Sequence, residues 1–286
     1  MLKRKATTFI KNWLDTKDKK CLVVQGARQT GKTYIIERFA EENFEELLEI
    51  NFKQMPSAMD IFAGDLTVDN MIMAMRFRFP EKKIVPGKTL IFLDEIQECQ
   101  EAITSLKFWA IDNRYDVITS GSLLGIDYKR ASSYPVGYVD YLRMYGIDFE
   151  EFLWAKGYSE AVIEDMLGHM LDIRPFNETE MAVYRALFLD FCVLGGMPAV
   201  IKRYIETGFF TDTLAIQRQI MLDYEEDLRK YAVGLDETKI INVFRSIPMQ
   251  LAKENKKFQL SKVSHSARTR EYQGCIDWLK DAGTVT

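Results

Sequence analysis

Short apolar runs alternate with helical patterns along roughly the first 125 residues of the chain. The runs have the length of buried strands, and the segments between them repeat their apolar residues at the spacing of a helix. This alternation is typical of βαβ units, in which parallel strands are joined by crossover helices. The pattern therefore predicts an α/β domain with a parallel sheet, preceded by an amphipathic helix in residues 1–20. The predicted strands are 21–25, 47–52, 88–96 and 115–121, and the predicted helices include 71–79 and 102–112.

The second half of the chain has a different pattern. Residues 126–145 are rich in Tyr, Ser and Gly and are predicted to form a loop or a short hairpin. From residue 148 to about 255, apolar positions recur at helical spacing almost throughout. The last thirty or so residues predict a short extended piece and two helices, the second around Thr269 to Asp281 with Gly283 as its C-cap.

Composition narrows the class of protein. Hydrophobic residues make up 47% and charged residues 28% of 286 residues, which is ordinary globular usage and excludes wholesale disorder. The net charge of -4 means that any nucleic-acid surface must be local. Four scattered cysteines and two histidines do not indicate a disulfide framework or a zinc site. No run approaches the roughly 18 apolar residues of a membrane span, and no signal peptide is recognisable, so we expect a cytoplasmic protein without membrane contact.

A glycine-rich segment follows the first predicted strand and matches the pattern G-x-x-x-x-G-K-[ST]. Its glycines let the backbone N–H groups surround a phosphate, and the following helix adds its positive end. Lys32 is predicted to reach the β- and γ-phosphates, and the Thr33 hydroxyl to bind Mg²⁺. The alternative is a glycine turn with a surface lysine. The predicted nucleotide-binding residues are Gly26, Ala27, Arg28, Gln29, Thr30, Gly31, Lys32, Thr33 and Tyr34.

Two acidic residues end the strongest predicted strand, some 60 residues further along. Asp94 is predicted to hold Mg²⁺ together with Thr33, and Glu95 to polarise the water that attacks the γ-phosphate. The alternative is that both carboxylates cap the next helix. Ser120, and less so Ser122, follow the next strand and could contact the γ-phosphate or the water, or simply lie in a serine-rich turn. The predicted catalytic residues are therefore Lys32, Glu95 and Ser120.

These motifs together resemble a family of uncharacterised prokaryotic AAA-type P-loop ATPases, the archaeal-ATPase branch. The resemblance rests on Gly26 to Thr33, Asp94 to Gln97 and Thr119 to Ser122, and continues through Asp148 to Leu153 and Gly195 to Pro198. Single motifs beyond the phosphate loop are weak, but their order and spacing are fairly specific.

The resemblance implies a RecA-like core, a helical lid and a small winged-helix module. We accordingly expect a P-loop core with its N-terminal helix in 1–145, a lid in 146–238 and a winged-helix-like domain in 239–286. Many family members carry a further C-terminal domain of unknown function, which would be absent or truncated here. Members often also have Gly-Arg before the segment at Asp148, where this chain has Gly137-Tyr138. An arginine sensor at that place is therefore in doubt, and Arg130 and Arg143 are nearby substitutes.

Residues 253–272 carry six basic and two acidic side chains, a local charge of +4. Such a segment, with Ser264, His265 and Ser266 in it, could bind the phosphate backbone of DNA. The alternative is a helical module whose charges only keep it soluble. The acidic run 223–227 is predicted to be a solvated face.

The leading hypothesis from the sequence is a Mg²⁺-dependent ATPase that couples hydrolysis to movement of the lid and winged helix over a partner, for which DNA, a protein or a second copy are candidates. The second is a nucleotide-gated switch with negligible turnover, and the third is a transcription regulator with a secondary ATP site. No N-K-x-D element follows the sheet strands, so ATP is favoured over GTP.

Overall fold

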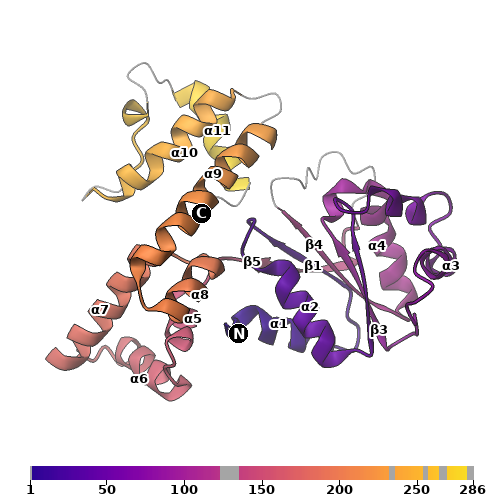
Figure 1. Cartoon of the computed structure of the whole chain (residues 1–286), viewed down its shortest axis with the longest axis horizontal. Coiled ribbons are helices and arrows are strands. Elements are labelled where there is room, and N and C mark those ends of the chain that lie inside the picture. The colour runs from indigo at the N-terminus through magenta and orange to yellow at the C-terminus, as the bar shows by residue number, and fades with distance from the viewer. Residues whose placement is uncertain (1, 123–134, 232–235, 254–256, 264–268, 282–286) are drawn as a thin grey trace.

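The computed structural model describes residues 2–122, 135–231, 236–253, 257–263 and 269–281. An α/β part with a sheet is followed by a helical region (Figure 1). Within this region, one long helix connects a first group of helices to the C-terminal helices.

Five parallel strands form the sheet, in the order β2-β3-β4-β1-β5. Strands β1 and β3 are buried along their whole length, as expected of continuous apolar runs in the interior of a parallel sheet. The chain passes from β1 to the β2 edge, returns through β3 and β4, and then crosses to the other side of β1. This confirms the predicted α/β fold with a parallel sheet. The strands are β1 (Cys21–Gly26), β2 (Glu46–Asn51), β3 (Thr89–Asp94), β4 (Asp116–Ser122) and β5 (Val139–Met144).

The fifth strand lies at the end of the segment 126–145, where a loop or short hairpin was predicted, so the prediction was wrong for residues 139–144; residues 126–134 lie outside the described residues. β5 pairs in parallel with β1 and lies at the edge of the sheet. Val139, Leu142 and Met144 are buried, whereas Tyr141 and Arg143 are exposed. A strand with so few buried positions gives no continuous apolar run, and the surrounding Tyr, Ser and Gly concealed it further.

Helices cover both faces of the sheet (Figure 1). Alternate residues of each strand point to opposite faces; for example, Ile91 and Leu93 pack in one core cluster, and Leu90 and Phe92 in the other. The first cluster lies under α3 and α4, and the second under α1 and α2. These helices are α1 (Lys5–Leu14), α2 (Lys32–Asn43), α3 (Val68–Arg78) and α4 (Gln100–Asp112).

The helical region begins directly after β5. Helix α9 is its longest element: its first half packs in the cluster of α5, α7 and α8, and its last turns pack with α10 and α11. A single helix thereby connects two hydrophobic clusters, as Figure 1 shows. The helices are α5 (Phe149–Ala155), α6 (Glu160–Leu171), α7 (Glu178–Leu194), α8 (Pro198–Thr207), α9 (Leu214–Tyr231), α10 (Glu237–Leu251) and α11 (Thr269–Asp281).

The C-terminal part contains the helix predicted at Thr269 to Asp281, now α11. Within the described residues between 236 and 281, the remaining elements are α10 and a short 3₁₀ turn, and there is no strand. The winged helix therefore stays a prediction. Gly283, predicted to cap α11, lies outside the described residues, as do Ser264, His265 and Ser266.

Two glycine segments cross at the start of the helical region. The Ile147 N–H donates a hydrogen bond to the Gly196 carbonyl at 2.6 Å. A Cβ on Gly196 would lie 2.5 Å from the Ile147 oxygen, and one on Gly146 would lie 2.7 Å from the Gly196 oxygen. Only glycine permits this approach. The crossing fixes the chain leaving β5 against the turn between α7 and α8.

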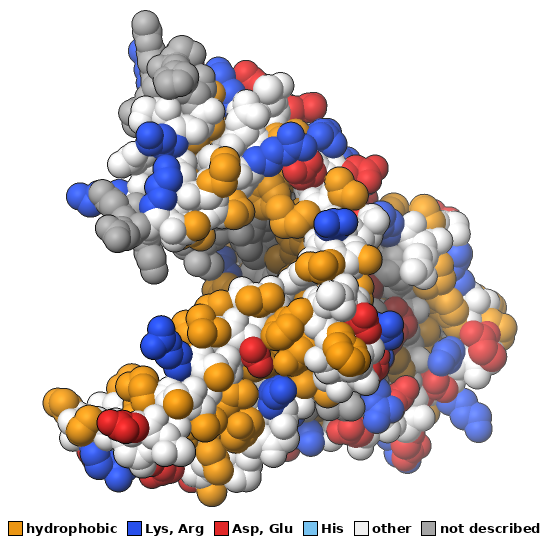
Figure 2. Space-filling view, turned by 60° about the vertical axis from the view of Figure 1, so that its left-hand side comes forward, with side chains coloured by type: hydrophobic (Ala, Val, Ile, Leu, Met, Phe, Trp, Pro, Cys, Tyr) orange, Lys and Arg blue, Asp and Glu red, His pale blue; other side chains and the backbone are white. Residues whose placement is uncertain are grey.

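Hydrophobic side chains are frequent on the surface of the helical region (Figure 2). Met170, Leu171 and Ile173, at and after the end of α6, and Leu189 and Val193 on α7 are each more than half exposed. Exposed apolar clusters are typical of surfaces that contact another molecule. Among the helices that the structure describes, none combines the length and apolarity needed to cross a bilayer.

Candidate functional site

The loop between β1 and α2 has the backbone shape that its sequence predicts. Gln29 and Gly31 both have a positive φ, 62° and 89°. The Thr30 hydroxyl donates to the Ala27 carbonyl at 2.9 Å, which closes the loop on itself. A Cβ on Gly26 would lie only 2.1 Å from the Met144 carbonyl oxygen, so this glycine also lets β5 approach. The loop is thus held between two strands and the start of a helix.

Lys32 lies at the first position of α2, and its side chain turns back over the loop. The Nζ atom donates to the carbonyls of Gly26 and Ala27, at 3.0 and 2.9 Å. Burial lowers the pKa of the ammonium, while the nearby carboxylates of Glu95 and Asp94 act in the opposite direction. This cation therefore lies on the side of the loop where an incoming anion would meet it.

Asp94 is the centre of a hydrogen-bond network at the carboxyl edge of the sheet, and it is only 4% exposed. Its Oδ2 accepts from the Thr33 hydroxyl at 3.2 Å and from the Asn51 amide at 2.9 Å. Its Oδ1 accepts from the Ser120 hydroxyl and from the Glu95 N–H. The ends of three neighbouring strands thereby meet beside the first turn of α2.

The oxygens of Thr33 and Asp94 suit a magnesium ion. Mg²⁺ prefers hard oxygen ligands in octahedral geometry, in which neighbouring ligand atoms are about 3 Å apart. The hydroxyl of Thr33 and the nearer carboxylate oxygen of Asp94 are 3.2 Å apart. These two residues fit the ion, with water and substrate completing its coordination.

Glu95 follows Asp94 in a left-handed conformation, with φ at 52°. Its carboxylate accepts a hydrogen bond from the Gln97 side-chain amide. Glu95 and Cys99 immediately precede the next two helical segments. Neither side chain accepts a capping hydrogen bond from the helix that follows it. The predicted alternative, in which the acidic pair only caps a helix, therefore finds no support in the geometry.

A cavity of about 640 Å³ opens over this network. Lys53, Asp223, Tyr224, Glu226, Asp227 and Lys230 also line it, of which the last five belong to α9. The predicted site residues on its wall are Arg28, Gln29, Gly31, Lys32, Thr33, Tyr34, Asp94, Glu95 and Ser120.

A smaller cavity, of about 290 Å³, lies on the other side of the loop. Gly26, Ala27 and Thr30, the remaining predicted loop residues, line this one. Its other wall is largely apolar and is formed by Met144, Met197, Ile220, Met221, Tyr224 and Phe244, among others. The loop therefore separates a polar cavity from an apolar one.

The helical pattern of α9 was predicted, but its contact with the phosphate loop was missed. The acidic run 223–227 was predicted to be a solvated face, and that was wrong. Asp227 is 5% exposed and forms an ion pair with Arg28. Asp223 accepts from the Gln29 amide at 2.7 Å, and the Tyr224 hydroxyl donates to the Arg28 carbonyl at 2.8 Å. The i, i+4 spacing of the two aspartates, which places them on one helix face, was the available signal.

The same turn of α9 also contacts α10. Arg245 donates two hydrogen bonds to Glu225, one of them at 2.7 Å, and lowers the pKa of that carboxyl. Burial raises the pKa of Tyr224 to about 12, so this phenol stays a neutral donor toward the loop. Helix α9 therefore contacts the predicted phosphate site with one face and the C-terminal helices with another.

Of the two substitute arginines, Arg143 is on β5 and lines the smaller cavity, and Arg130 lies outside the described residues. Arg28 is the one arginine among the described residues that line the larger cavity. Ser122 is the last residue of β4, and its side chain is not among those that the structure describes.

Comparison with protein families identifies two segments of the chain. Residues 18–153 match a family described as an AAA domain. This segment is similar to that family. Residues 185–286 match a domain of unknown function, DUF8612. The first matched segment spans the sheet, the phosphate loop and the acidic pair. The second match falls within the helices, whereas the resemblance had led us to expect a domain of unknown function only after the winged helix.

Three solved structures are similar to this chain, and the first of them, with a TM-score above 0.5, shares its fold. A Walker-type ATPase of Pyrococcus abyssi is 13% identical, with 99% of this chain and 90% of that one covered and a TM-score of 0.57. Orc1 of Aeropyrum pernix in complex with DNA is 14% identical, with 98% and 82% covered and a TM-score of 0.38. AMPPCP-bound DnaA of Aquifex aeolicus is 12% identical, with 98% and 88% covered and a TM-score of 0.41. Among curated proteins, none matches the sequence.

Proposed function

We propose that this chain is a Mg²⁺-dependent ATPase of the AAA type. The observation that carries the proposal is the meeting of Lys32 and Thr33 with Asp94 and Glu95 around one cavity at the carboxyl edge of the sheet. Lys32 and the loop N–H groups would neutralise charge that develops on the phosphates. Thr33 and Asp94 would hold Mg²⁺, which neutralises charge on the phosphate oxygens when bound. Glu95 would orient the attacking water.

The smaller cavity supports a purine nucleoside as the rest of the substrate. It borders the same loop as the larger cavity, and its wall is mostly apolar, as expected for the faces of an aromatic base. A nucleotide could therefore place its base on one side of the loop and its phosphates on the other. Since no N-K-x-D element for guanine occurs after the strands, we propose ATP as the substrate.

Helix α9 supports coupling of the nucleotide state to the helical region. Arg28 pairs with Asp227, and Gln29 with Asp223, at the site proposed for the phosphates. A triphosphate would compete with these carboxylates for the loop, because like charges repel strongly in a partly buried cavity. Since Glu225 of the same helix binds Arg245 of α10, displacement of α9 would also move the C-terminal helices.

Asp227→Asn is expected to strengthen ATP binding about threefold to tenfold. The change removes a carboxylate that competes with the phosphates for Arg28 and that adds a negative charge to the cavity wall. An ion pair of this kind contributes roughly 1 kcal/mol, which is the expected gain in binding free energy. Isothermal titration calorimetry with Mg²⁺ and ATP measures the effect. Glu206→Gln is the control, because this exposed carboxylate on α8 pairs with Lys202 and lies outside the cavity wall; the affinity should stay within about twofold. Unchanged or weaker binding by Asp227→Asn would contradict displacement of α9.

The function itself is tested by phosphate release at saturating ATP, with and without Mg²⁺. We expect nucleotide-saturable, magnesium-dependent release, and a calorimetric titration should show one ATP site per chain. Repeating the assay over a range of protein concentrations tests whether self-association changes turnover. Adding duplex DNA tests whether DNA does. A chain that takes up no ATP in the presence of magnesium would rule out the proposal.

A second candidate is a nucleotide-gated switch or regulator with negligible turnover of its own. The observation that favours it is that Arg28, the one arginine among the described residues on the cavity wall, is engaged by Asp227. Hydrolysis slows greatly when no arginine stabilises the transition state. Tight ATP binding with release that stays negligible, alone and with partners, would support the switch.

DNA is the partner proposed through residues 253–272. The described basic residues of this segment, Lys253, Lys257, Lys262 and Arg270, are exposed. The positive charge of these side chains is the observation that supports DNA as a partner. Binding to a phosphate backbone through such charges weakens steeply as the salt concentration rises.

A further inference from the structure

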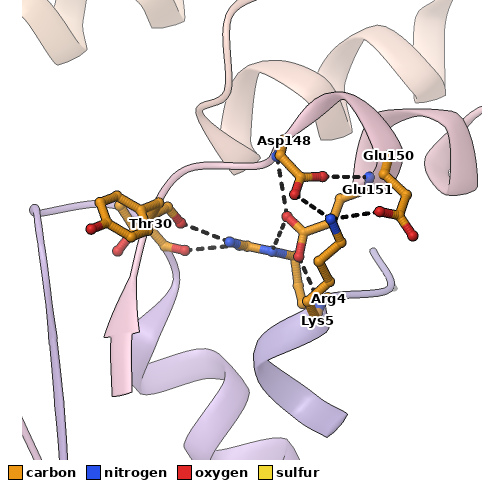
Figure 3. A network of polar contacts seen from close by, with 7 residues as sticks. Arg4, Lys5, Thr30, Asp148, Glu150 and Glu151 are labelled. Atoms are coloured by element: carbon orange, nitrogen blue, oxygen red, sulfur yellow. Dashed lines mark hydrogen bonds and ion pairs between the residues drawn. The ribbon is translucent and has the colours of Figure 1, made fainter. Parts of the chain in front are cut away.

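A buried arginine lies under the phosphate loop and contacts three separate elements (Figure 3). Arg4 immediately precedes α1 and is 6% exposed. Its Nε donates to Oε2 of Glu151 at 3.0 Å, its Nη1 to the Thr30 carbonyl at 3.1 Å, and its Nη2 to the Tyr145 carbonyl at 2.7 Å. Each nitrogen of the guanidinium therefore has its own acceptor.

The bond to Thr30 orients one peptide group of the loop. In a trans peptide the C=O and the next N–H point in opposite directions. Since the Thr30 carbonyl points at Arg4, the Gly31 N–H points away from it. Gly31 lines the larger cavity, and its φ of 89° is accessible without strain only to glycine. Because glycine has no Cβ to restrict its backbone, this peptide could otherwise rotate, and the hydrogen bond from the guanidinium supplies the restraint.

The other two bonds connect this peptide to the beginning of the helical region. Tyr145 follows β5, and Glu151 belongs to the capping box of α5, in which it is paired with Asp148. The second oxygen of Glu151 accepts from the Lys5 N–H at 2.7 Å. The Glu151 side chain is only 5% exposed. The loop, the chain leaving the sheet and the first helix of the helical region therefore meet at one guanidinium.

A purely structural role does not explain this arrangement well. A buried ion pair costs desolvation energy, and apolar residues of similar volume usually stabilise a protein as much or more. Two of the three acceptors of Arg4 are main-chain carbonyls that a shorter or apolar side chain could not reach in this geometry.

We propose that Arg4 is a positioning residue for the phosphates: it holds the Gly31 N–H toward the nucleotide and ties that peptide to the start of the helical region. The inference rests on the proposed function of the loop as an ATP site. Arg4 touches no substrate itself and acts through the backbone of Thr30 and Gly31.

Two variants of the full chain test this role. Arg4→Lys keeps the charge opposite Glu151 but cannot donate to three separated acceptors. Arg4→Met combined with Glu151→Gln removes both buried charges together, so no carboxylate is left unpaired, and the Gln oxygen can still accept a backbone N–H. Each variant is expected to bind Mg²⁺ and ATP about tenfold or more weakly, the usual loss for a hydrogen bond to a charged group. Calorimetry gives the Kd, and circular dichroism gives the Tm of the same samples.

The matched control is Lys5→Ala. Lys5 is the next residue, and its side chain is about half exposed and pairs with Asp148 and Glu150 at the same end of α5 rather than with the loop. Its loss should leave the Kd within about twofold.

The outcomes separate this inference from the proposed function. If the wild-type chain binds no ATP, the proposed function fails and Arg4 has nothing to position. If the wild type binds ATP and both Arg4 variants bind it equally well, only the inference is overturned. A lower Tm with an unchanged Kd would likewise overturn it, since that is the signature of a structural role alone.

Discussion

Lys32→Ala should weaken ATP binding about a hundredfold and reduce phosphate release below detection. In the structure its ammonium is partly buried beside the loop carbonyls of Gly26 and Ala27 and near the carboxylates of Asp94 and Glu95. A cation in a partly buried site stabilises phosphate charge more than one on the surface, by roughly 3 kcal/mol at the transition state. Steady-state phosphate release and calorimetry measure the two effects.

Lys88→Ala is a suitable control for this prediction. Lys88 is exposed, forms an ion pair with Glu45, and lies before β3, at the end of the sheet opposite the cavity. It should leave turnover within about twofold. Near-normal turnover of Lys32→Ala would show that the loop does not act on phosphate.

The lowered pKa of Lys32 adds a dependence on pH. Only the charged ammonium attracts phosphate, and burial makes it lose its proton at a lower pH than the ordinary value of 10.5. Bound phosphate would raise the pKa again, so ATP binding should take up protons in alkaline solution. Affinity should then fall as pH rises through the lowered pKa, whereas in Lys32→Ala this dependence should disappear.

The central strands and the two motifs of the site could be predicted from the sequence because their signals are local. A fully buried parallel strand is largely apolar, as 21–24 and 90–93 are, and a loop that surrounds phosphate needs glycine at fixed positions. Parallel strands end at one edge of a sheet, which is why Thr33 and Asp94 could be expected to meet. In the structure they lie in hydrogen-bond contact.

The parts that could not be predicted depend on contacts between distant residues. Asp227 pairs with Arg28, 199 positions earlier in the chain, and nothing within a run of acidic residues reveals which basic group will face it. Asn51 is a similar case: its amide donates a hydrogen bond to Asp94, but a single asparagine at the end of a strand gives no pattern. β5 was missed because this edge strand buries only three of its six side chains, and six such residues in a Tyr-rich segment resemble a loop.

Glu95→Gln is expected to leave ATP affinity almost unchanged and to slow phosphate release at least about a hundredfold. Glutamine has the same size and keeps an oxygen that can accept the Gln97 amide, so the backbone at Glu95 and the contact of its N–H with Asp94 should persist. What is lost is a carboxylate able to accept a proton from the attacking water, a contribution of roughly 10² to 10⁴ in rate.

Single-turnover phosphate release at saturating Mg²⁺ and ATP isolates this step from binding and product release. Glu98→Gln is the control: Glu98 is exposed, three residues further along, and outside the cavity wall. A rate for Glu95→Gln close to that of the wild type would show that Glu95 is not the base, although Asp94 could still hold the metal. A wild-type rate already as slow as that of the variant would instead favour the nucleotide-gated switch, because the carboxylate would then contribute nothing to turnover until a partner completed the site.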